Sequence, residues 1–206
     1  MPIAAVVGCA VMTGVGAVVN TARVEPGSTL LVIGAGGVGL CAIMGAVLAG
    51  AARIIAADVN PAKLGLATSF GATDVVDSWH EDVVDAVREL TGGGVDYAFE
   101  VIGLTRTVEQ AVRAVRVGGT AVAVGIVPTH HGTGQRPAAR HAGEDAQGLD
   151  LGIDPAAGGF PRLFELYRRG RLPLDRLLTR EWPLDRINEA YDALLAGTVA
   201  RSVVVP

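Results

Sequence analysis

The sequence predicts an α/β fold built on a doubly wound parallel sheet, and three observations support this prediction. Between residues 24 and 126, short apolar runs of strand length alternate with longer segments of helical period. A glycine cluster follows the first of these runs directly. The chain of 206 residues is 50% hydrophobic, which suits one domain with a large core. Because βαβ crossovers are right-handed, we expect helices on both faces of the sheet, as in a Rossmann fold.

Five apolar segments are expected to form this sheet, in the spatial order 3-2-1-4-5. They are residues 30–34, 53–58, 74–77, 95–101 and 120–126. Between the second and third segments, Asn60 is the expected N-cap of a helix, Pro61 takes its first position and Gly71 ends it.

Regular patterns return after residue 159. A helix is expected from Phe160, with Pro161 near its start and Gly170 at its end. Asp185 is expected to cap a further helix, and the last six residues, "RSVVVP", are expected to form a short strand. The apolar positions of that further helix are Ile187, Ala190, Tyr191 and Leu194.

Residues 127–159 break the pattern, because they are poor in large apolar residues and long for a structureless loop in a compact domain. Only Leu149, Leu151 and Ile153 alternate there, which supports at most a weak sixth strand at the sheet edge. We expect this segment to be poorly ordered. A pair of compensating frame changes in the gene would explain its abrupt start and end.

Charge and cysteine content narrow the expected partners and compartment. The net charge is −4, and the scattered Lys and Arg residues form no basic stripe, so we expect a small-molecule partner rather than nucleic acid. The two cysteines have no paired spacing, which fits a reducing cytoplasm better than a secreted disulfide framework.

The first 22 residues carry no charge, which is also a property of membrane spans. No basic region precedes them, and Gly8, Gly14 and Gly16 interrupt the apolar stretch. We therefore expect a buried helix and no membrane partner.

The glycine cluster has the spacing GxGxxG, formed by Gly34, Gly36 and Gly39, with Gly37 and Val38 between. In a strand–turn–helix unit the first glycine permits the tight turn, the second admits a pyrophosphate to bare backbone, and the third lets the helix pack on the strand. The helix N-terminus supplies unpaired N–H groups to the anion. The cluster therefore predicts a dinucleotide site.

Asp58 ends the next predicted strand, about 20 residues after Gly39, where its carboxylate is placed to accept both ribose hydroxyls of the adenosine. A carboxylate there would repel a 2′-phosphate, so we expect NAD rather than NADP. The alternative is an acid that merely ends a strand or caps a turn.

Several motifs in order, including "GCAVMTG", "NPAK", "FEVIG" and "VARSVV", resemble the coenzyme-binding half of the zinc-dependent alcohol dehydrogenases in the medium-chain dehydrogenase/reductase family. The similarity is strongest to the branch with the glutathione- or mycothiol-dependent formaldehyde dehydrogenases. The resemblance implies that Cys9 is a ligand of the catalytic zinc and that Thr13 lies near the nicotinamide. The other implied coenzyme contacts are Lys63 at the adenosine ribose, Val101 and Ile102 along the cleft, the backbone of Val124 and Ile126 at the carboxamide, and Arg201 at the pyrophosphate.

From the residues alone, these positions have other readings. Lys63 and Arg201 are equally consistent with solvated surface side chains, and Val101 and Ile102 with plain core residues.

The chain departs from the family in what precedes "GCAVMTG". The family places about half its length there, with the remaining zinc ligands, a structural zinc loop and a proton relay. Because a catalytic zinc takes three protein ligands and Cys9 is one, we expect Cys9 to be a buried free thiol. His130, His131 and His141 are expected to lie in a solvated loop without a metal.

These observations predict three parts. Residues 1–22 are a helical lead-in from the catalytic domain, 23–180 an NAD-binding domain, and 181–206 a helix and strand on the catalytic-domain side.

The expected function is the coenzyme-binding portion of an alcohol dehydrogenase that transfers hydride between an alcohol or aldehyde and nicotinamide. As this chain alone it is expected to be inactive, and the homo-oligomer implied by the resemblance is expected to be weakened by residues 127–159. The alternative is a non-catalytic NAD-binding module or the product of a truncated gene.

Overall fold

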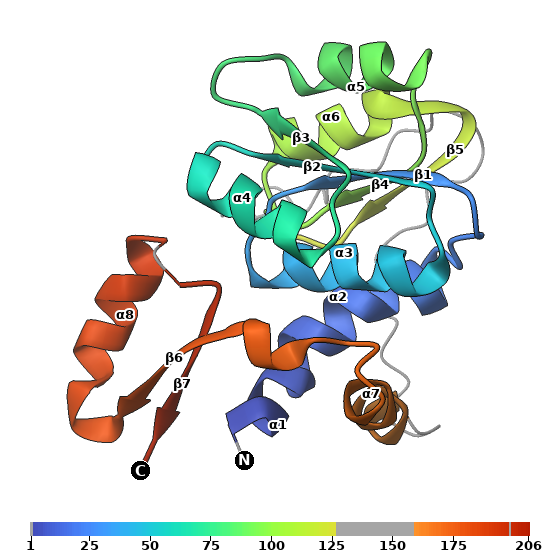
Figure 1. Cartoon of the computed structure of the whole chain (residues 1–206). Coiled ribbons are helices and arrows are strands. Elements are labelled where there is room, and N and C mark those ends of the chain that lie inside the picture. The colour runs from blue at the N-terminus through green and yellow to red at the C-terminus, as the bar shows by residue number, and fades with distance from the viewer. Residues whose placement is uncertain (1, 127–158, 198) are drawn as a thin grey trace, which may run out of the picture.

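The computed structural model describes residues 2–126, 159–197 and 199–206, and its main feature is a five-stranded parallel sheet (Figure 1). The order β3-β2-β1-β4-β5 and the parallel pairing confirm the predicted fold class and topology. Strand β5 begins earlier than predicted, and its pairing with β4 is irregular between Val95 and Tyr97. The strands are β1 (Thr29–Ile33), β2 (Arg53–Asp58), β3 (Asp74–Asp77), β4 (Val95–Glu100) and β5 (Val115–Ala123).

The sheet is covered on both faces, which explains why its central strands are almost continuously apolar. In β1, Leu30 and Val32 enter the core on one face, whereas Leu31 and Ile33 enter the core on the other. Helices α3 (Gly37–Ala49) and α4 (Pro61–Phe70) cover the first face (Figure 1). Helices α5 (Val83–Thr91) and α6 (Thr105–Ala114) cover the second.

The predicted boundaries of two helices are confirmed. The Asn60 side chain accepts a hydrogen bond from the Ala62 N–H of α4 at 3.0 Å, and Gly71 ends that helix with a φ of +117°. Helix α7 (Gly159–Arg168) contains the apolar positions predicted from Phe160, and Gly170 follows it with a φ of +69°.

The predicted cap at Asp185 is wrong, although the helix that it was expected to begin is present as α8 (Ile187–Leu195). Asp185 lies inside a 3₁₀ turn, η4 (Leu184–Arg186), and Arg186 occupies the cap position without a side-chain cap bond. Because the turn runs directly into α8, the aspartate lies one residue too early to cap it.

The N-terminal segment forms one helical rod, Pro2–Thr21, which packs against α3. By length and composition the rod could cross a membrane, but 56% of its apolar window is buried inside the protein, as expected for a core helix. A Cβ on Gly14 would lie 2.5 Å from the Val38 carbonyl oxygen of α3, so the two helices touch backbone to backbone there. The rod consists of α1 (Pro2–Val6), the π-helical turn η1 (Val7–Val11), α2 (Met12–Gly16) and the π-helical turn η2 (Ala17–Thr21).

A second, two-stranded parallel sheet pairs β6 (Leu178–Pro183) with β7 (Arg201–Val205) beside α1 (Figure 1). Strand β7 is the predicted C-terminal strand, whereas β6 was not predicted. The boundary expected between residues 180 and 181 falls inside β6. The division of the chain into three parts stays a prediction. A short 3₁₀ turn, η3 (Leu174–Arg176), precedes β6.

The expectations for residues 127–158, including the three histidines and the weak sixth strand, lie outside the described residues.

The contact between the N-terminal rod and α3 can be tested at Gly14. Gly14→Ala forces a methyl group against the α3 backbone and should lower the free energy of unfolding by about 1–3 kcal/mol. Gly8→Ala is the matched control, because no atom lies within 4 Å of a Cβ there. The control should be neutral or slightly stabilising in urea unfolding. Equal effects of the two substitutions would contradict this packing.

Candidate functional site

The glycine turn at the carboxyl end of β1 has three glycines with three different surroundings. Gly34 has a φ of +103°, and a Cβ on Gly39 would lie 1.8 Å from the Gly34 carbonyl oxygen, so neither position accepts a side chain. Gly36, the N-cap of α3, has no atom within 4 Å of a Cβ and makes no side-chain cap bond. The N-terminus of α3 is therefore open and lacks a side-chain cap, as an anion site requires.

Arg201 reaches this turn from β7. A Cβ on Gly37 would lie 2.1 Å from the Arg201 Nε and 2.8 Å from its Cζ, so the guanidinium rests on bare backbone. The Nε atom is buried and has no hydrogen-bond partner within the described parts of the chain. The N-terminus of α3 and the Arg201 cation, whose buried Nε is an unused donor, therefore converge at this turn. This set of donors fits the pyrophosphate of a dinucleotide.

Asp58 is buried at the end of β2 and connects this turn to the next helix. Its Oδ2 accepts a hydrogen bond from the Ala35 N–H at 2.8 Å, and its Oδ1 accepts one from the Asn60 N–H at 2.9 Å. Asp58 therefore does cap the turn, which is the alternative role that the sequence allowed. Each carboxylate oxygen keeps a second lone pair, so acceptance of ribose hydroxyls stays a prediction. Lys63 is half-buried, with its Nζ 3.8 Å from a Cβ built on Gly197.

The other predicted coenzyme contacts follow β4 and β5, at the same carboxyl edge of the sheet as the glycine turn. Ile102 lies over the glycine turn, because a Cβ on Gly34 would be 2.7 Å from its Cγ1. Val101 is half-buried and Val124 buried, whereas Ile126 is exposed. The structure thus gathers the predicted cleft residues at the carboxyl edge of the sheet. Sequence reasoning missed two exposed apolar residues at this edge, Val59 and Leu104.

Glu100, at the end of β4, is a further residue that sequence reasoning missed. It is fully buried, and its Oε1 accepts hydrogen bonds from Ile102 N–H at 2.8 Å and Gly103 N–H at 2.7 Å. The available signal was a glutamate that ends an apolar strand, because glutamate is almost never fully buried unless its carboxylate is bound by partners.

Cys9 is exposed, so its predicted burial is wrong. It lies in η1, and the half-buried Thr13 follows on the same rod. No group of three His, Cys, Asp or Glu side chains that could hold a metal occurs among residues 2–126, 159–197 and 199–206. These residues therefore do not fit a catalytic zinc. The other cysteine, Cys41, is buried, which raises the pKa of its thiol to about 12.

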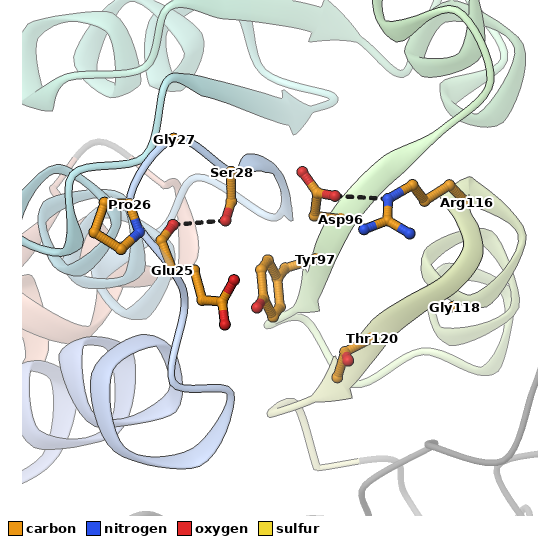
Figure 2. Close-up of a pocket in the computed structure, with 9 residues that line it drawn as sticks. All are labelled: Glu25, Pro26, Gly27, Ser28, Asp96, Tyr97, Arg116, Gly118 and Thr120. Atoms are coloured by element: carbon orange, nitrogen blue, oxygen red, sulfur yellow. Dashed lines mark hydrogen bonds and ion pairs between the residues drawn. The ribbon is translucent and has the colours of Figure 1, made fainter.

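A small polar pocket of about 250 Å³ lies at the opposite, amino end of the strands (Figure 2). Asp96 lines this pocket, and its Oδ2 accepts hydrogen bonds from the N–H and hydroxyl of Thr29 at 2.7 and 2.8 Å. The Arg116 Nε donates to its Oδ1 at 2.6 Å. Although burial opposes the shift, these bonds hold the pKa of Asp96 below its usual value. Because the protein itself provides partners for both oxygens, we assign this pocket a structural role. It is lined by Glu25, Pro26, Gly27, Ser28, Asp96, Tyr97, Arg116, Gly118 and Thr120.

The fold and the open glycine turn define a dinucleotide-binding domain. A family model described as zinc-binding dehydrogenase matches residues 37–142. The chain belongs to this zinc-binding dehydrogenase family and corresponds to the C-terminal half of the zinc-type, medium-chain alcohol dehydrogenases.

Individual relatives agree with this assignment. Alcohol dehydrogenase class-3 of Myxine glutinosa is 40% identical over 200 residues, or 96% of this chain and 53% of the relative. The structure of benzyl alcohol dehydrogenase from Acinetobacter calcoaceticus is 33% identical with a TM-score of 0.86, covering 96% of this chain and 55% of that one. A protein assigned to the zinc-binding dehydrogenases from Sinorhizobium meliloti 1021, solved with NADP, is 28% identical with a TM-score of 0.72 over 96% and 58%. The chain thus spans about half the length of these relatives.

The Asp96 cluster gives a pH-dependent prediction. Because the folded pKa is lowered, the stabilisation by Asp96 is present at pH 7 and is lost as the pH falls below the ordinary aspartate value of about 3.9. Asp96→Asn should lower the free energy of unfolding at pH 7 by about 1–2 kcal/mol. Urea unfolding of both proteins from pH 7 to pH 3 should show the gap closing at low pH. A gap that is constant with pH would contradict this role.

Proposed function

We propose that this chain binds NAD(H) as the coenzyme-binding part of a dehydrogenase that transfers hydride between an alcohol or aldehyde and nicotinamide. The observation that carries the proposal is the open glycine turn with the unpartnered Nε of Arg201 directed at it. The names of the relatives, which are alcohol dehydrogenases, support the substrate class.

In this proposal, each residue binds or orients the coenzyme. The N-terminus of α3 and Arg201 hold the pyrophosphate, Asp58 accepts the adenosine ribose hydroxyls, and Lys63 lies nearby. The cleft wall formed by Val101, Ile102, Val124 and Ile126, with Thr13, orients the nicotinamide. We further propose a cytoplasmic location, since the cysteines have no paired spacing.

The coenzyme is proposed to be NAD rather than NADP, although one relative was solved with NADP. The reason is electrostatic, because a buried carboxylate at the ribose would repel a 2′-phosphate. No cation comes directly after Asp58, where Val59 and Asn60 stand.

A second candidate function is coenzyme binding without turnover. It is favoured by the lack, within the described ranges, of a group of three metal-ligating side chains. NAD binding together with NADH production supports the enzyme, whereas NAD binding without turnover supports a binding module.

The ribose assignment can be tested at Asp58. A hydrogen bond to a charged group is worth about 1.5–3 kcal/mol, so Asp58→Ala should weaken NAD binding about ten- to a hundredfold and narrow the difference from NADP. Calorimetric titration of both coenzymes measures this. Asp74→Ala, which removes the carboxylate that pairs with Arg53 at the amino end of β3, is the control and should leave both affinities unchanged. Unchanged NAD affinity in Asp58→Ala would refute the assignment.

Turnover by the chain alone gives a further prediction. With NAD, zinc and a panel of alcohols we expect no NADH absorbance over hours, because a catalytic zinc takes three protein ligands and supplies several kcal/mol of barrier reduction. Each 1.36 kcal/mol is about tenfold in rate, so the loss amounts to orders of magnitude. Zinc-dependent NADH production that disappears in Cys9→Ala would show a complete site and contradict this expectation.

A further inference from the structure

Glu100 makes hydrogen bonds to both backbone segments that carry the predicted cleft residues, 101–103 and 124–126. Its side-chain Oε1 accepts from the N–H groups of Ile102 and Gly103, and Thr107 Oγ1 donates to the same oxygen at 2.8 Å. Its main-chain carbonyl accepts from Val124 N–H at 2.7 Å and Gly125 N–H at 3.1 Å. One buried residue therefore connects segment 101–103 to segment 124–126.

The two segments also touch directly, so their separation is fixed by backbone contact. A Cβ on Gly103 would lie 2.4 Å from the Ile126 carbonyl oxygen, and a Cβ on Gly125 would lie 2.1 Å from the Gly103 nitrogen. Gly103 has a φ of +91°, a conformation that the two bonds to Glu100 help to hold. A shift of one segment must therefore move the other.

The second carboxylate oxygen shows that stability alone is a poor account of Glu100. Oε2 is buried and has no hydrogen-bond partner among the residues that the structure describes, which costs free energy. That cost offsets part of the stabilisation that Oε1 provides. The clearer effect of Glu100 is geometric, because its Oε1 fixes the backbone of the turn through Ile102 and Gly103.

We propose that Glu100 is a positioning residue that sets the cleft wall 101–103 and 124–126 against the glycine turn, so that the nicotinamide half of the coenzyme meets a preformed surface. This inference rests on the proposed coenzyme-binding function. Glu100 acts through Ile102, whose side chain lies over Gly34. The adenosine side does not depend on it, because Asp58 itself holds the turn through Ala35.

The experiment compares NAD with AMP, which lacks the nicotinamide half, in calorimetric titrations of the full chain. Glu100→Ala should weaken NAD binding about tenfold and AMP binding less than about threefold. Glu100→Gln keeps an oxygen acceptor and should retain NAD affinity within about threefold. Asp96→Ala is the matched control, because it removes a bonded carboxylate from the other end of the same strand and should alter neither affinity.

Thr107 provides a second route that leaves the carboxylate in place. Thr107→Val should weaken NAD binding about threefold, and Thr107→Ser should restore it, with thermal unfolding recorded for each variant. This pair of variants decides the question if Glu100→Ala does not fold.

Three results would overturn the inference. Equal losses of NAD and AMP affinity in Glu100→Ala, or an equal loss in the Asp96→Ala control, would show general destabilisation. NAD binding by the wild type that neither the Glu100 nor the Thr107 substitutions weaken would remove the positioning role while leaving the proposed function intact. A wild type that binds neither NAD nor AMP would refute the proposed function itself and this inference with it.

Discussion

The close approach of α3 to the end of β1 is the contact on which the rest of the candidate site depends. With no side chain at Gly39, the helix backbone comes directly against the Gly34 carbonyl, and no other residue type permits this. The first N–H groups of α3 are thereby fixed at the carboxyl edge of the sheet. Asp58, Arg201 and Ile102 reach the same turn from three different elements, so a change in this one contact would displace all of them.

The parts of the fold that could be predicted are those encoded by short-range signals. The strands at β1 and β2 are continuous apolar runs between turn residues, and Asn60, Pro61 and Gly71 mark α4 without reference to the rest of the molecule. The strand order was predictable because connections between parallel strands are right-handed in nearly all proteins. The glycine turn was predictable because Gly34 and Gly39 each meet a local steric demand.

The failures have different causes. Cys9 was expected to be buried because free cysteines usually are, but it is exposed on the π-helical turn η1. Strand β6 has mostly exposed polar residues and exists because β7 pairs with it. Glu100 escaped notice because its three donors come from residues brought around it by the turn after β4.

The buried position of Asp58 has a consequence for how coenzyme preference could change in this lineage or in the laboratory. The carboxylate that anchors the backbone of Ala35 and Asn60 is also the group that we propose to select against a 2′-phosphate. Under that proposal, coenzyme preference and the shape of the turn depend on one side chain, and a substitution that removes both carboxylate oxygens removes both. An amide at this position would remove the charge and keep one oxygen acceptor, so it would retain part of the anchor while it lifts the repulsion.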